Sequence, residues 1–140
     1  MNNIFLDTNV IIDFLADRKP FSEFAAAIFT LADNEAIKIY ASAITFNNVY
    51  YIIRQISSHK KALALLSDLE SMVDIIEVNK VIIKQALHSD FRDFEDAIQY
   101  MCALTNDKIE FIVTRNHKDF KKRQLPVFSP EIAFGILKNH

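Results

Sequence analysis

The 140-residue chain has one glycine, Gly135, one cysteine, Cys102, and no tryptophan. Because phosphate-binding loops and dinucleotide fingerprints need several glycines, the composition excludes both kinds of site. A single cysteine cannot form an internal disulfide and fits a reducing compartment. No apolar run approaches the roughly 20 residues of a membrane helix, and the N-terminus lacks the basic segment of a signal peptide. We therefore expect a cytoplasmic protein with no membrane contact.

The charge balance is close to neutral. Sixteen basic and eighteen acidic residues give a net charge of −2, and 51% of the residues are hydrophobic. This composition is typical of a globular protein and excludes a disordered chain. It also argues against a surface coated for nucleic acid, although one local basic patch remains compatible with it.

Short extended patterns alternate with helical patterns along the chain. Strands are predicted at residues 4–6, 37–41, 73–78, 111–113 and 127–128. Helices are predicted at residues 9–15, 21–32, 45–56, 60–69, 80–88, 93–105 and 130–137. This alternation is typical of βαβ units. The predicted fold class is therefore α/β, a three-layer α/β/α sandwich with a central parallel sheet.

Short polar residues follow three of the predicted strands. Asp7 comes directly after the first strand, Asn48 shortly after the second, and Asn116 and Asp119 after the fourth. In open parallel sheets, binding sites form beyond the carboxyl ends of the strands. We therefore expect these side chains to meet at one edge of the sheet.

The predicted helix at residues 93–105 adds further carboxylates. At 100° per residue its apolar residues fill one arc, which we take as the buried face. Asp93 lies within this arc and Asp96 on its margin, so both are predicted to lean inward. Glu95 and Gln99 lie outside the arc and are predicted to face water.

Several carboxylates on one rim repel one another unless a cation neutralises them, and hard oxygen ligands favour Mg²⁺ or Mn²⁺. Such an ion lowers the pKa of a bound water and stabilises a phosphodiester under attack. The candidate metal ligands are Asp7, Asp93, Asp96 and Asp119. Asn48 and Asn116 are candidates for hydrogen bonds to water or substrate.

Each acid also has a purely structural interpretation. Asp7 could only cap the following helix. Asp93 and Asp96 could form a first-turn pair favoured by the helix dipole, and Asp119 could be an ordinary loop residue. The metal hypothesis depends on their convergence at one edge of the sheet.

Residues 115–123 hold five basic side chains against one acid. Beside an anionic metal site, Arg115, Lys118 and Lys121 are predicted to contact phosphates of a nucleic acid. The alternative is a solvated loop, which is the commoner reason for a run of charge.

Three segments carry a family resemblance. The sequences IFLDTNVIIDFL, DFEDAIQYMCAL and FIVTRNHKDF, in this order, resemble the motifs of PIN-domain proteins, a ribonuclease family that includes VapC-type toxins of toxin–antitoxin pairs. LPVFSPE resembles the family's closing strand and turn. The resemblance spans essentially the whole chain, which implies a single PIN-like domain over residues 1–140. It also implies an α/β/α sandwich.

The resemblance has implications for chemistry and partners. It implies cleavage of single-stranded RNA with Mg²⁺ or Mn²⁺, a homodimer, and, for a toxin, an antitoxin protein that covers the site. The family's first metal-binding aspartate corresponds to Asp7, and its central acid to Asp96 with Asp93 as a neighbour. Asn116 occupies a place often held by aspartate, and Asp119 follows it.

One position departs from the family pattern. Members usually carry a glutamate on the helix after the second strand, and here that position is Asn48. This favours an alternative hypothesis, a catalytically degenerate PIN-like domain that binds RNA or a protein partner without cleavage. A third hypothesis is a phosphohydrolase with Asp7 as nucleophile, although no second aspartate follows two residues later to act as the acid.

Overall fold

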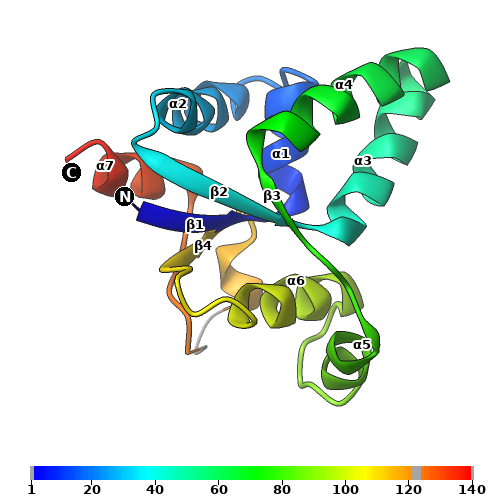
Figure 1. Cartoon of the computed structure of the whole chain (residues 1–140), viewed down its shortest axis with the longest axis vertical. Coiled ribbons are helices and arrows are strands. Elements are labelled where there is room, and N and C mark those ends of the chain that lie inside the picture. The colour runs from blue at the N-terminus through cyan, green and yellow to red at the C-terminus, as the bar shows by residue number, and fades with distance from the viewer. Residues whose placement is uncertain (1, 121–123, 140) are drawn as a thin grey trace.

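The computed structural model describes residues 2–120 and 124–139. Within these residues, five parallel strands form one sheet in the order β3-β2-β1-β4-β5 (Figure 1). The strands are β1 (Asn2–Leu6), β2 (Ile37–Ser42), β3 (Asp74–Ile76), β4 (Phe111–Val113) and β5 (Val127–Phe128). The predicted central parallel sheet is confirmed.

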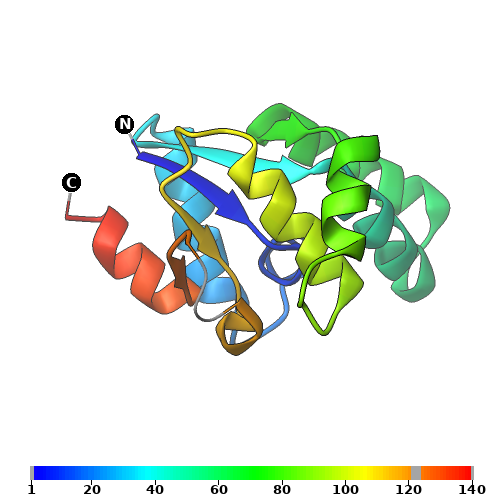
Figure 2. The same ribbon diagram turned by 90° about the horizontal axis from the view of Figure 1, so that it is seen from below.

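Helices cover both faces of the sheet. One face carries α1 (Thr8–Leu15), α2 (Ser22–Asp33), α3 (Ala43–Ile56), α4 (His59–Met72) and α7 (Pro130–Leu137). The other carries α5 (Lys80–Leu87) and α6 (Phe94–Leu104), which lie in front of the sheet in Figure 2. The three-layer α/β/α prediction is therefore also confirmed.

The alternation of side chains along the strands builds the two cores. On β1, Ile4 and Leu6 enter the core under α1 and α2, whereas Phe5 enters the core under α6. On β4, Val113 and Ile112 divide between the two cores in the same way. Because both faces are covered, the strands consist of nearly continuous apolar residues.

The chain reverses its direction across the sheet at β1. It runs outward from β1 through β2 to β3, and it then returns to the opposite side of β1 with β4 and β5. Leu6 pairs with Val113, so the residues that follow them, Asp7 and Thr114, lie side by side. In sheets of this kind, ligands bind at the point where the strand order reverses.

Every predicted strand and helix is present, with ends that differ by three residues at most. A 3₁₀ helix at His117–Phe120 was not predicted. Cys102 is fully buried on α6 and packs in the core between this helix and the sheet. Among the described residues, none of the helices combines the length and the apolar character needed to cross a membrane.

Candidate active site

Asp7 occupies the carboxyl end of β1 and is only 3% exposed. Its Oδ1 accepts a hydrogen bond from the backbone N–H of Thr8 over 2.8 Å, so Asp7 does cap α1. Its Oδ2 accepts from the Thr114 hydroxyl over 2.8 Å and from Asn9 Nδ2 over 3.4 Å. Burial raises the pKa of this carboxyl to about 6, although the Thr114 hydrogen bond opposes the shift. Asp7 is therefore both a helix cap and a buried acid at the carboxyl ends of the strands.

Asp96, in the first turn of α6, is half-buried and lines the same cavity as Asp7. Burial, together with the negative charges of Asp7, Asp93, Asp119 and Glu95, raises its pKa to about 7. A carboxyl surrounded by other carboxylates gains stability from protons or cations. The site therefore favours a cation beside Asp96.

Asp93 is the N-cap of α6. Its Oδ1 accepts from the backbone N–H of Asp96 over 2.9 Å, and its side chain is exposed. The predicted inward lean of Asp93 is therefore wrong. Its charge still raises the pKa of both Asp7 and Asp96, so it lies within electrostatic reach of the cavity.

The prediction that Glu95 and Gln99 face water is wrong. Glu95 is half-buried and lines the cavity with Asp7 and Asp96, and Gln99 is fully buried. The helix buries a different face from its most apolar arc, since Phe94 and Leu104 are 47% and 40% exposed. The four-residue spacing of Glu95 and Gln99 places both on one side of the helix, but it does not show that this side is buried.

Gln99 belongs to a buried polar network that links α6 to α1 and α3. Its Nε2 donates to the hydroxyl oxygens of Thr8, over 2.9 Å, and Thr45, over 3.0 Å. These two hydroxyls also bond to each other over 2.8 Å. The network holds the three helices in one arrangement around the cavity. Thr8, Thr45 and Gln99 were not predicted as site residues from the sequence.

The cavity has a volume of about 170 Å³ and lies at the carboxyl ends of β1 and β4. It is lined by Asp7, Thr8, Asn9, Ile12, Arg18, Ile52, Glu95, Asp96 and Asn116. Three carboxylates face one basic side chain here. That side chain, Arg18, lies 3.3 Å from the carboxylate of Asp13 and is partly neutralised by it. The charge of the lining therefore suits a cation.

The donor set fits a hydrated magnesium-like ion better than a fully enclosed one. Among the described residues, no three Asp, Glu, His or Cys side chains stand close enough to share an ion directly. Mg²⁺ is usually held by one or two carboxylates and keeps several waters. Asp7 and Asp96 could provide such a pair. Gln99 Oε1 is buried without a hydrogen-bond partner among the described residues.

The remaining predicted site residues lie around the rim. Asn48 on α3 is half-buried, and its Nδ2 donates to Glu95 Oε2 over 2.7 Å. Asn116 lines the cavity, and its backbone N–H donates to Thr114 Oγ1 over 3.1 Å. Asp119 is exposed in the 3₁₀ helix, outside the lining. It acts on Asp96 through its charge.

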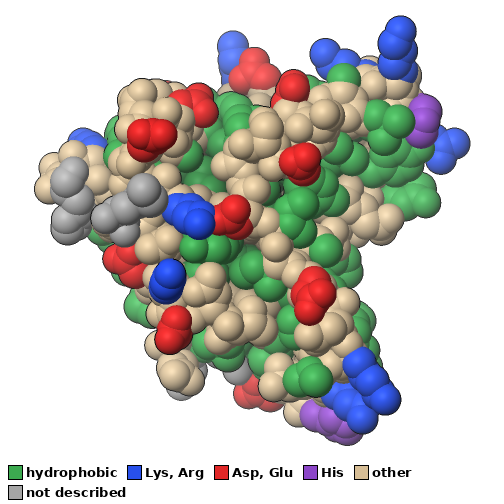
Figure 3. Space-filling view, viewed as in Figure 1, with side chains coloured by type: hydrophobic (Ala, Val, Ile, Leu, Met, Phe, Trp, Pro, Cys, Tyr) green, Lys and Arg blue, Asp and Glu red, His purple; other side chains and the backbone are tan. Residues whose placement is uncertain are grey.

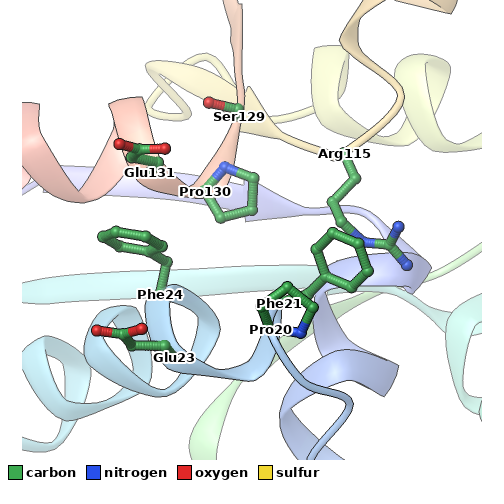
Figure 4. Close-up of a pocket in the computed structure, with 8 residues that line it drawn as sticks. All are labelled: Pro20, Phe21, Glu23, Phe24, Arg115, Ser129, Pro130 and Glu131. Atoms are coloured by element: carbon green, nitrogen blue, oxygen red, sulfur yellow. The ribbon is translucent and has the colours of Figure 1, made fainter.

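The three predicted phosphate contacts differ in their surroundings. The Arg115 guanidinium lies beside the Phe21 ring (Figure 4), 4.0 Å from the centre of that ring. It also pairs with Asp13. It borders a second cavity of about 490 Å³ between the first turns of α2 and α7. Lys118 is exposed, and Lys121 lies outside the described residues. On the face shown in Figure 3, basic side chains are scattered among acidic ones.

Comparisons with known proteins identify the family of this chain. A family model described as PIN domain matches residues 3–118. The chain is 26% identical to Ribonuclease VapC1 of Aquifex aeolicus, over 75% of this chain and 81% of the relative.

Solved structures share the fold. DNA-bound VapBC from Salmonella typhimurium superimposes with a TM-score of 0.71 at 19% identity, covering 93% of this chain and 99% of that one. A toxin–antitoxin complex from Klebsiella pneumoniae gives 0.64 at 23% identity, covering 91% and 97%. The match of the family model over most of the sequence is decisive: the chain belongs to the PIN-domain family.

Proposed function

We propose that this chain is a divalent-metal-dependent ribonuclease that cleaves single-stranded RNA. The observation that carries the proposal is the placement of Asp7, Glu95 and Asp96 around one cavity, at the strand-order reversal of a PIN-domain sheet. The relationship to a curated VapC ribonuclease supports this activity.

In the proposed site, Asp7 and Asp96 hold the ion, which is Mg²⁺ or Mn²⁺. When bound, the ion supplies an activated water and stabilises the charge that develops on the phosphodiester. Asp93 and Asp119 lie outside the lining and orient water or a second ion through their charge. Asn116 hydrogen-bonds to water or substrate at the cavity mouth.

The substrate approaches along the segment that follows β4. Lys118 is exposed there and contacts phosphates that flank the scissile bond, and Lys121 is assigned the same role from the sequence. Arg115 is assigned it as well, although Asp13 neutralises much of its charge. Such contacts position RNA without reading its sequence.

We also propose that the protein is the toxin of a toxin–antitoxin pair, acts in the cytoplasm and forms a homodimer. The support is that solved structures with this fold include VapBC and other toxin–antitoxin complexes. Light scattering of the purified protein tests the dimer. Purification of an affinity-tagged chain from its native cells tests for an antitoxin. We expect one small, stoichiometric protein partner that inhibits RNA cleavage when it is added back.

The decisive experiment is cleavage of a mixed-sequence single-stranded RNA in Mg²⁺, in Mn²⁺ and in EDTA. Asp7→Asn and Asp96→Asn proteins, purified in parallel, control for contaminating nuclease. We expect cleavage by the natural protein only, and only with metal. Cleavage that persists in EDTA and in both variants would contradict the metal mechanism. Silence in both metals would favour the hypothesis of an RNA- or protein-binding domain without cleavage.

A further inference from the structure

Asn48 stands where the resemblance to the family implies a glutamate, and the structure shows what faces it. Asn48 Nδ2 donates to Glu95 Oε2 over 2.7 Å. Asn48 comes from α3 and Glu95 from α6, so the contact joins two helices at the mouth of the cavity. A glutamate at position 48 could not donate this hydrogen bond, because an ionised carboxylate only accepts.

A second donor reaches the same oxygen. The Thr8 hydroxyl lies 3.0 Å from Glu95 Oε2. Gln99 Nε2 can only donate, so Thr8 and Thr45 both accept from it. The Thr8 hydroxyl has one proton, which it donates to Glu95. The hydrogen bond between the two threonine hydroxyls is then donated by Thr45 to Thr8. All the donors of the network therefore point toward Glu95.

The common direction of these hydrogen bonds argues that the contacts with Glu95 are specific. Thr45 and Gln99 are fully buried and Thr8 is 8% exposed, so each donor in this hydrogen-bond network has a fixed geometry. The acceptor at its end is a carboxylate held from two sides, by α1 through Thr8 and by α3 through Asn48. Charge-assisted hydrogen bonds of this kind are short and strong, so they fix the position of the carboxylate.

We infer that Glu95 supplies from α6 the negative charge that Asn48 does not supply from α3, and that Asn48 is its positioning residue. The inference rests on the proposed metal-dependent function. The site then keeps three cavity-lining carboxylates, Asp7, Glu95 and Asp96. Asn48 then contributes to the function of the site, and its presence does not indicate a degenerate site.

The test measures Mn²⁺ binding by titration calorimetry, without RNA. Glu95→Gln keeps the shape and the acceptor oxygen but removes the charge, so we expect affinity to fall by about tenfold, as for supporting residues of other metal sites. The exchange variant, Asn48→Glu with Glu95→Gln, puts the acid on α3 and the amide donor on α6. We expect it to bind Mn²⁺ nearly as well as the natural protein.

Matched controls separate this effect from general changes of surface charge. Glu70→Gln removes an exposed acid on α4, and Asn47→Glu adds one at the exposed neighbour of Asn48. We expect both to leave affinity unchanged. Circular dichroism confirms that each variant is folded before titration.

The possible failures are distinguishable. If Glu95→Gln binds Mn²⁺ like the natural protein while Asp96→Asn does not bind, the inference is overturned and the proposed function stands. If the exchange variant binds no better than Glu95→Gln, the positioning role of Asn48 is overturned. If the natural protein itself does not bind millimolar Mn²⁺, the proposed metal site fails and the inference with it.

Discussion

Arg115 donates two hydrogen bonds to the buried carboxylate of Asp13. Its Nε donates to Oδ2 over 2.6 Å and its Nη2 to Oδ1 over 3.2 Å, and Asp13 is 1% exposed. The Arg115 backbone N–H also donates to Asn9 Oδ1 over 3.2 Å. The pair therefore fastens the segment after β4 to α1, and it fixes Thr114 and Asn116 relative to Asp7.

This ion pair predicts that Asp13 contributes substantially to the free energy of unfolding. Asp13→Asn leaves two arginines, Arg18 and Arg115, facing a neutral amide, and we expect a loss of about 3 kcal/mol of unfolding free energy. Urea denaturation measures the change. Asp17→Asn, at an exposed position with φ 50° that asparagine tolerates, is the control and should change stability by less than about 0.5 kcal/mol. Equal losses in the two variants would mean that the ion pair has no special role.

The two described basic residues of this segment should affect different measurements. Lys118 is exposed, so Lys118→Ala should weaken RNA binding uniformly and lower the slope of its salt dependence by about 0.7 for each phosphate that is no longer neutralised. Arg115→Lys keeps the charge but loses the paired hydrogen bonds to Asp13. We therefore expect a lower kcat with nearly unchanged RNA affinity. Filter binding over a salt series, together with single-turnover cleavage, separates the two. The assignment is wrong if Arg115→Lys shifts only affinity.

The fold could be predicted because its signals are local. The apolar runs at β1 and β4 and the helical periodicity between them depend on neighbouring residues only. Asp7 could be placed at the sheet edge for the same reason, since the residue after a buried parallel strand has few other positions. Convergence of Asp7 with Asp96 then followed from the topology.

The orientation of α6 could not be predicted in this way. The apolar arc was taken as the buried face, but Phe94 is 47% exposed while Gln99 is fully buried. Gln99 is buried because Thr8 and Thr45, from two other helices, satisfy its amide. A polar residue buried by distant partners leaves no periodic signal in its own segment. Glu95 was therefore missed, although its partner Asn48 was a candidate site residue from the sequence.

The raised pKa values predict how the metal-free protein responds to pH. The pKa is about 6 for Asp7 and about 7 for Asp96, against 3.8 for each as a free side chain. The folded state therefore holds more protons than the unfolded state above pH 4, and stability falls as pH rises from about 4 to about 7. For buried Asp7 the shift corresponds to on the order of 3 kcal/mol.

Denaturation in EDTA at pH 5 and pH 8 measures this effect. We expect the lower midpoint at pH 8, and Asp7→Asn should remove part of the difference. A midpoint that rises through this window would contradict the electrostatic description of the site, because depressed rather than raised carboxyl pKa values would then dominate.

Asp96→Asn should have opposite effects with and without metal. In EDTA at pH 8 the substitution removes a carboxylate that Asp7 and Glu95 repel, so the variant should be more stable than the natural protein. In Mg²⁺ at about a hundred times its Kd, the natural protein should gain about 2.7 kcal/mol, and the variant should gain little. Asp93→Asn is the matched control, because asparagine also caps helices and Asp93 lies outside the cavity lining. Its Mg²⁺ gain should persist. If both variants lost the gain equally, Asp93 would hold the ion as closely as Asp96 does. If neither lost it, the ion would bind elsewhere, and the stabilising effect of Asp96→Asn in EDTA would then reflect charge repulsion alone.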